Sequence, residues 1–488
     1  MPEDPDSLTV ESFGRKLRAG EVTARAITEE CLHRIETDNS RLNAFIRVMA
    51  DEARAQAAAA DRELAAGIDR GPLHGVPISI KDLLDIRDVP TTAASRVRDG
   101  HIAERDAPAV AHLRQAGAVF VGKTNLHEFA FGTTNEDSAF GPARNPHDLS
   151  RSPGGSSGGS AISVAAGMAL ATVGTDTGGS IRIPAAACGI VGLKPSVGEV
   201  STDQVVPLSR TLDHVGPLAR TVTDAWLVYR ALLGAATADP PSGASGDSSY
   251  VSGPPSYVSG DPSYVVSGFS RTSRNPEVLV PVPTGGLRLA VPRAYFCELL
   301  DDEVRSCFEA SLNRLRAGGV RIDDVEIAHS RDTAPIYLAL VLADAAAYHA
   351  ATLDSMPERY TPPVRIRLEM GRYVLGEDYA RALKGREVLR RDVDAALAGH
   401  DAIVLPTLPI PAPPLGAASM EVSGHDEPVR NLMLRQTQLF NLTGHPAISL
   451  PCGRTAGGLP CGLQLVGARG QTDALLRVAL ACEPYLNL

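Results

Sequence analysis

Two Gly-Gly-Ser turns on either side of a short apolar stretch are the feature that most restricts how this chain can fold. Residues 150–160 read Ser-Arg-Ser-Pro-Gly-Gly-Ser-Ser-Gly-Gly-Ser, and residues 174–184 read Gly-Thr-Asp-Thr-Gly-Gly-Ser-Ile-Arg-Ile-Pro. Small apolar residues fill the interval and predict a tightly packed helix followed by a strand. Because glycine lets a backbone come close to a ligand, we expect both turns at a functional site.

Runs of β-prone residues alternate with helical patterns along most of the chain. The early runs are residues 73–80, 119–121 and 169–173, and a helical pattern spans 107–116. Later runs follow the same alternation, at residues 287–291, 320–327, 402–405 and 447–450. This order predicts an α/β fold in which helices cover both faces of a sheet.

We expect a single domain over residues 1–488, divided into four parts. Residues 1–66 are predicted to form N-terminal helices, because apolar residues recur there with helical spacing. Residues 67–234 carry the two turns, and residues 286–488 supply the remainder of the α/β domain. Between them, residues 235–285 are rich in Pro, Gly, Ser and Tyr and form an insert.

A short repeat within this insert places Tyr250, Tyr257 and Tyr264 seven positions apart. Its Pro, Gly and Ser content excludes a coiled coil. The repeat is compatible with a surface loop or a pair of strands. It is also compatible with a flap over the active site that grips an aromatic substrate.

Charge and cysteine usage narrow the class of protein. The formal net charge of −10 argues against a nucleic-acid partner. Seven scattered cysteines without a Cys-x-x-Cys pair are typical of a reduced, cytoplasmic chain. The acidic N-terminus has no signal-peptide pattern. The stretch 161–174, taken as the longest weakly polar one, is too short to span a bilayer, so no membrane association is expected.

Several known site types do not match the glycine-rich turns. Neither the phosphate-binding Gly-x-x-x-x-Gly-Lys-Ser/Thr pattern nor a Gly-x-Ser-x-Gly elbow occurs there. His127-Glu-Phe-Ala-Phe131 lacks the second histidine of a zinc motif, so no metal site is expected. We interpret His74, His214 and His445 as structural histidines and Cys188 as a packing residue.

The two turns, together with Ile80-Lys81-Asp82 upstream, resemble the amidase signature family. The resemblance is strongest over residues 73–235 and continues in residues 140–146, 441–451 and 458–467. It implies a central mixed, twisted sheet and a Ser–cis-Ser–Lys triad, here Ser180, Ser156 and Lys81. It further implies a cis peptide bond between Gly155 and Ser156, and a reaction that needs no cofactor.

The chemistry of such a triad sets requirements on each residue. Ser180, the expected nucleophile, needs a base to take its proton, and Ser–Lys pairs are a known alternative to histidine. A free lysine has a pKa of roughly 10.4, so holding its amine neutral at pH 7 costs about 4.6 kcal/mol. Burial away from water can lower the pKa by the amount that this requires. We therefore expect Lys81 to be enclosed, without a carboxylate salt bridge, and Ser156 to relay the proton.

Other residues are expected to support the site. The backbone N–H groups of Thr177, Gly178, Gly179 and Ser180 would form the oxyanion hole. By the family pattern, Ser157 and Arg182 would hold the triad in place. Substrate-pocket candidates are Phe129, Phe131, Thr133 and Thr134, because they precede the first turn. Arg365, Arg367 and Arg372, on a helix predicted over 363–375, could meet an anionic substrate or form a solvated face.

The expected activity is hydrolysis of an amide, aryl amide or carbamate C–N bond through a Ser180 acyl-enzyme, with a small-molecule amide, ester or carbamate as substrate. One alternative is the amidotransferase subunit that releases ammonia from glutamine for tRNA-dependent synthesis. Another is a non-catalytic scaffold. The motif Asn441-Leu-Thr-Gly-His-Pro446 favours the free-standing hydrolases. Monomer and homodimer both remain open.

Overall fold

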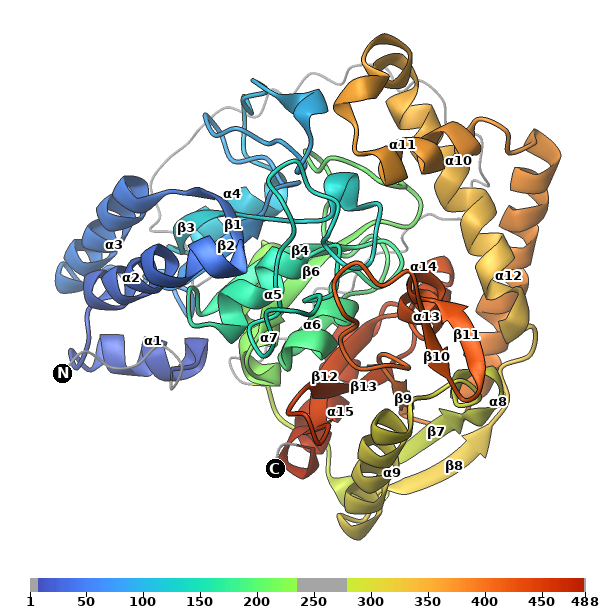
Figure 1. The fold of residues 1–488 in the computed structure, drawn as a ribbon. Helices are drawn as coiled ribbons and strands as arrows, with labels where there is room; N and C mark the ends of the chain where they lie inside the picture. Colours follow the sequence, from blue (N-terminus) through green and yellow to red (C-terminus); the bar gives the residue numbers. More distant parts are fainter. Residues whose placement is uncertain (1–7, 235–278, 487–488) are drawn as a thin grey trace, which may run out of the picture.

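The computed structural model describes residues 8–234 and 279–486, which are built around one eleven-stranded sheet (Figure 1). The strand order is β1-β3-β2-β4-β6-β5-β12-β13-β9-β7-β8. In chain order the strands are β1 (Phe45–Val48), β2 (Pro77–Lys81), β3 (Val119–Thr124), β4 (Ala171–Asp176), β5 (Val191–Lys194), β6 (His214–Ala219), β7 (Arg288–Pro292), β8 (Arg321–Val325), β9 (Ala402–Pro406), β12 (Ala447–Arg454) and β13 (Pro460–Val466).

The sheet is mixed. Strand β2 runs parallel to β3 and β4, and β7 runs parallel to β8 and β9. The other pairings in the sheet are antiparallel. A separate hairpin joins β10 (Ser419–Val422) and β11 (His425–Pro428). The predicted α/β class and mixed central sheet are thus confirmed.

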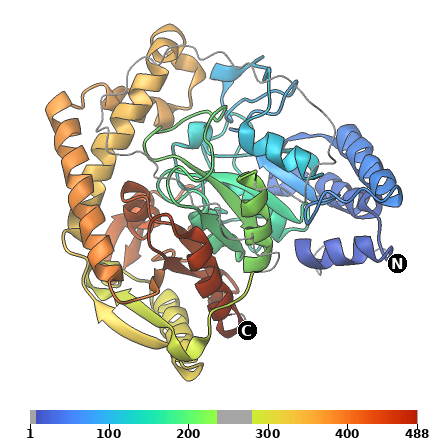
Figure 2. The ribbon, with the colours of Figure 1, turned by 180° about the vertical axis from the view of Figure 1, so that it is seen from behind.

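Helices lie on both faces of this sheet (Figures 1 and 2). Helices α5 (Gly158–Ala165) and α6 (Arg182–Cys188) cover one face, and α4 (Pro108–Gln115), α7 (Val222–Leu232) and α15 (Thr472–Cys482) lie on the other. The remaining helices are α1 (Val10–Arg18), α2 (Ala24–Leu42), α3 (Ala50–Ala65), α8 (Arg293–Phe296), α9 (Asp302–Ala317), α10 (Thr333–Ser355), α11 (Pro362–Gly371), α12 (Gly376–Leu397), α13 (Val429–Arg435) and α14 (Gln438–Leu442).

The central strands explain how distant motifs meet. Every residue of β2, β3 and β4 is buried, as expected for strands covered on both faces. Strand β2 pairs in parallel with β4, with Ile80 opposite Val173. The carboxyl ends of both strands therefore reach the same edge of the sheet, where Lys81 ends β2 and Asp176 ends β4.

The predicted N-terminal helices are present as α1, α2 and α3, and the structure adds the short strand β1, which pairs with β3 at the sheet edge. Four residues are too few to show a periodicity. One expectation needs correction. The stretch 161–174 is not the longest weakly polar one, because residues 330–355, which include α10, are long and apolar enough to cross a membrane by length and composition. In this fold α10 packs along α11 and α12.

The tyrosine repeat of the insert lies outside the described residues.

Candidate active site

Lys81 is enclosed at the end of β2 and is surrounded by hydroxyl groups. Its ammonium nitrogen donates to Ser156 Oγ at 2.8 Å, Ser157 Oγ at 2.8 Å and Thr175 Oγ1 at 2.7 Å. The side chain is fully buried, and no carboxylate among the described residues forms a salt bridge with it. Burial lowers the pKa of Lys81 to about 7, against the opposing fields of Asp176 and Asp213. This amine can therefore exist in its neutral form near neutral pH.

The first Gly-Gly-Ser turn leads directly into α5 and supplies two of these hydroxyls. The peptide bond between Gly155 and Ser156 is cis. Ser157 Oγ accepts from Lys81 and donates to the carbonyl of Thr175 at 3.1 Å, so it joins β2 to β4. Both serines are fully buried. The turn thus holds two hydroxyls against one amine.

The second Gly-Gly-Ser turn connects β4 to α6 and carries Ser180. Its backbone carbonyl accepts from the N–H of Ser157 at 3.2 Å, which places the two turns side by side. In residues 8–234 and 279–486, no hydrogen bond joins the hydroxyls of Ser156 and Ser180. Within the same ranges the backbone N–H groups of Gly178, Gly179 and Ser180 also donate to no acceptor. These buried N–H groups could bind an oxyanion.

A buried ion pair between Arg182 and Asp176 stabilises the second turn. Arg182 Nη2 lies 2.9 Å from Asp176 Oδ1, and neither side chain is exposed. The guanidinium also donates to Thr437 O, Gln464 Oε1 and Asn441 Oδ1. Burial alone would raise the pKa of Asp176, but the charge and hydrogen bonds of Arg182 hold it well below its ordinary value. Arg182 therefore ties the turn to β13 and α14 rather than facing the cavity.

Thr177 is held by a second buried carboxylate. Its hydroxyl donates to Asp213 Oδ1 at 2.5 Å, and Asp213 also accepts from the backbone N–H groups of Leu208 and Ser209. Burial raises the pKa of Asp213 to about 6, while these hydrogen bonds oppose the shift. The Thr177 side chain is thus fixed by Asp213, a residue that the sequence analysis did not single out.

A small cavity of about 10 Å³ contains Ser180. Two of the predicted pocket residues, Phe131 and Thr133, line it. Phe129 does not, because its ring packs on His349 and Tyr360 at centroid distances of 4.3 and 5.6 Å. Thr134 lies outside the lining as well, and its carbonyl accepts from Ser152 Oγ. Residues that the sequence analysis missed complete the lining, and they are Ala130, Gly132, Leu208, Tyr337, Arg430 and Leu434.

The three arginines of the predicted helix have different environments. Arg365 pairs with Glu369 and Arg372 with Asp354 on the outer surface. Arg367 instead donates to the carbonyl of Phe131 at 2.5 Å, and its guanidinium lies 5.8 Å from the centre of that ring. Only Arg367 of this group therefore approaches the Ser180 cavity.

The histidines near the family motifs have structural partners. His74 Nε2 lies 2.8 Å from Ala60 O, and His214 Nδ1 lies 2.7 Å from Leu212 O. His445 Nε2 lies 3.0 Å from Asp394, and His127 Nε2 lies 3.1 Å from Asp137. None of these four imidazoles lines the cavity that contains Ser180.

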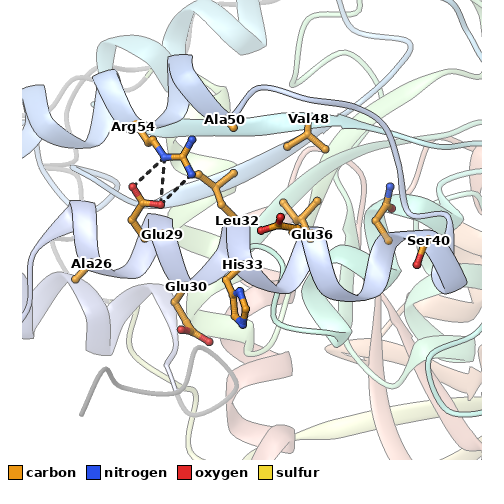
Figure 3. Close-up of a pocket in the computed structure, with 12 residues that line it drawn as sticks. Ala26, Glu29, Glu30, Leu32, His33, Glu36, Ser40, Val48, Ala50 and Arg54 are labelled. Atoms are coloured by element: carbon orange, nitrogen blue, oxygen red, sulfur yellow. Dashed lines mark hydrogen bonds and ion pairs between the residues drawn. The ribbon is translucent and has the colours of Figure 1, made fainter.

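A wide groove lies elsewhere, along α2 and the start of α3 (Figure 3). It measures about 990 Å³, and its lining includes Glu29, Glu30, Glu36 and Arg54. Arg54 donates to Glu29 across the groove (Figure 3). The groove contains none of the motif residues described above, so its size does not make it the active site.

Comparison with known proteins agrees with the geometry. The family model named Amidase matches residues 26–476. A glutamyl-tRNA(Gln) amidotransferase subunit of Koribacter versatilis is 37% identical, with 99% of each chain covered. An amidase of Pseudomonas putida is 38% identical, with 98% of this chain and 95% of that one covered. A crystal structure described as an amidase superposes with a TM-score of 0.86 at 36% identity, over 98% of this chain and 100% of that one. The chain therefore belongs to the amidase family.

Proposed function

We propose that this protein is a free-standing hydrolase of small amides, aryl amides or carbamates. Ser180 attacks the acyl carbon, Ser156 passes the proton to Lys81, and Lys81 returns it to the leaving nitrogen. Water then enters, gives its proton to the same relay and releases the acid from Ser180. The observation that carries this proposal is the buried amine of Lys81, which is hydrogen-bonded to Ser156 Oγ. The pKa of this amine is lowered to about 7.

The backbone of the second turn supports the same mechanism. The N–H groups of Gly178, Gly179 and Ser180 are buried and have no acceptor in the described parts of the chain. A buried donor without a partner is costly. The negative oxygen of a tetrahedral intermediate would satisfy these donors at the moment that it forms, which lowers the barrier.

A second candidate function rests on the relatives. Proteins named as subunits of glutamyl-tRNA(Gln) amidotransferase align with nearly the whole chain. Glutamine, the ammonia donor in that reaction, carries an α-ammonium as well as a carboxylate. The small cavity with Ser180 has no carboxylate in its lining, but the adjoining pocket of about 280 Å³ includes Glu427, so the lining does not separate the two functions. The motif Asn441-Leu-Thr-Gly-His-Pro446 is the observation that favours the free-standing hydrolase.

A direct assay separates the two functions. The purified chain is incubated alone with a 4-nitroanilide, a 4-nitrophenyl ester and a urethane of the same acyl size, with Ser180→Ala as the matched control. The proposal expects anilide or urethane turnover that is lost in the variant. Turnover only of glutamine, and only with a partner protein present, would favour the amidotransferase.

A further inference from the structure

An outer pocket of about 280 Å³ shares part of its lining with the Ser180 cavity. Arg430 and Leu434 line both spaces. They lie four residues apart on α13, so their side chains fall on the same face of that helix. The inner cavity has room for about one small group. The bulk of a substrate would therefore lie in the outer pocket, beside Arg430.

Three arginines line the outer pocket, and two of them have partners. Arg331 lies 2.6 Å from Glu298. Arg435 donates to Tyr295 O at 2.7 Å, and its guanidinium lies 3.8 Å from the centre of the Tyr295 ring. Both are therefore fixed by the protein itself.

Arg430 differs from them. Its Nε is buried without a hydrogen-bond acceptor, and its guanidinium forms no salt bridge within the described residues. Arg367 beside it is also a cation, and Tyr337 is neutral at pH 7. Glu427 lines the same pocket but forms no salt bridge with Arg430 among the described residues. Burial lowers the pKa of Arg430 from its ordinary value, but a guanidinium remains charged at neutral pH.

Arg430 is partly buried, and a partly buried cation without a salt bridge is available to a ligand that supplies the opposite charge. A guanidinium presents a planar set of donors that matches a carboxylate. We infer that Arg430 is the specificity residue of this site and binds a carboxylate group of the substrate. This inference rests on the proposed function and narrows it to amides that also carry a carboxylate.

The test measures binding in the Ser180→Ala background, where substrate would persist. Two matched pairs of ligands place the charge on opposite sides of the scissile bond. Glutaryl 4-nitroanilide is compared with its terminal carboxamide, and N-acetyl-4-aminobenzoate with N-acetyl-4-aminobenzamide. Dissociation constants come from calorimetry, and thermal shifts give a second readout.

We expect the carboxylate member of at least one pair to bind about tenfold tighter or more. Adding Arg430→Met should reduce that ratio to about one, while Arg430→Lys should retain part of it. Arg365→Met, which removes the same charge from α11, should leave the ratio unchanged. The Arg430→Met protein should melt close to the temperature of its parent or higher, because Arg430 forms no salt bridge among the described residues and its Nε is buried without an acceptor.

Equal binding within both pairs, or a ratio that survives Arg430→Met, would overturn the inference. Wild-type turnover of either glutaryl 4-nitroanilide or neutral acetyl 4-nitroanilide tests the proposed function separately. Turnover without tighter binding of the carboxylate ligands would contradict only the inference about Arg430. Tighter binding of the carboxylate ligands without any turnover would contradict only the proposed function.

Discussion

The amine of Lys81 and the hydroxyl of Ser156 are joined by a 2.8 Å hydrogen bond in a region closed to solvent. Two further hydroxyls lie within hydrogen-bond distance of the same nitrogen, and no carboxylate among the described residues forms a salt bridge with it. The proposed mechanism uses Ser156 among these hydroxyls, because the hydroxyl of Ser157 is already donated to the carbonyl of Thr175.

Replacing Lys81 by Met should remove the base without adding bulk. Since general-base catalysis contributes about 10²–10⁴-fold, we expect kcat/KM for an anilide to fall by at least about a hundredfold. Lys194→Met is a matched control, because Lys194 is also fully buried but donates, within the described parts of the chain, only to the carbonyls of Pro195 and His445. Per folded molecule, this control should keep its activity. A Lys81 variant with wild-type turnover at neutral pH would show that the base is another group.

The pH dependence of activity should report the same lysine. Because the neutral amine is the active form, kcat/KM should rise with pH through about 7, the pKa of buried Lys81. The measurement is a pH–rate profile with a substrate that does not titrate between pH 5 and 9. A profile that falls across this range would contradict the assignment.

Folding stability should change with pH in a linked way. The pKa of Lys81 is lowered in the folded state, so the unfolded chain binds the extra proton between pH 7 and pH 10.5. Lys81 therefore lowers the free energy of unfolding as pH falls through this window. The free energy of unfolding of Lys81→Met, relative to wild type, should increase as pH falls from 10 to 7. Urea unfolding at several pH values measures this difference, and a constant difference would contradict the shifted pKa.

Much of this site could be predicted from the sequence because its chemistry lies in short local motifs. Lys81 ends an apolar run, and Ser156 and Ser180 each follow two glycines. Tyr337 and Arg430 could not be predicted in the same way. They reach the cavity from α10 and α13, and a single tyrosine or arginine on a helix carries no local signal of what it faces.

For the fold, too, features with a local sequence pattern could be predicted and features that depend on tertiary contacts could not. Buried strands such as β2 and β4 are recognisable because they are continuously apolar, whereas the edge strand β1 depends on pairing with β3. The prediction that Phe129 lines the substrate pocket was wrong for a related reason. Its neighbours along the chain line the cavity, but its own backbone is left-handed (φ 50°) and its ring packs on His349. The direction in which the Phe129 ring points is set by tertiary packing, which the local sequence does not reveal.

Arg182 should matter for stability more than for substrate binding. Replacing it by Met leaves Asp176 buried without its partner, which should cost about 3–5 kcal/mol of unfolding free energy. The control is Arg54→Met, which breaks a partly exposed pair with Glu29 and should change stability much less. Urea unfolding compares the two. Equal effects would show that the buried pair does not brace the turn.

Gly179→Ala should damage the second turn directly. Gly179 has φ +141°, and an added Cβ would collide with the Thr437 hydroxyl that donates to Gly178 O. If this backbone forms the oxyanion hole, kcat/KM should fall by about a hundredfold or more. Gly458→Ala is the control, because it also has a positive φ but open space around it. Similar activity in both variants would argue against an oxyanion role.

The most direct measurement of the central claim is covalent labelling of the nucleophile. The purified chain is treated with a fluorophosphonate, its intact mass is measured, and the modified peptide is mapped. The account predicts a single adduct on Ser180, formed faster as pH rises through about 7 and absent from Ser180→Ala. An active protein that labels at another residue, or that remains unlabelled while its activity persists, would contradict it.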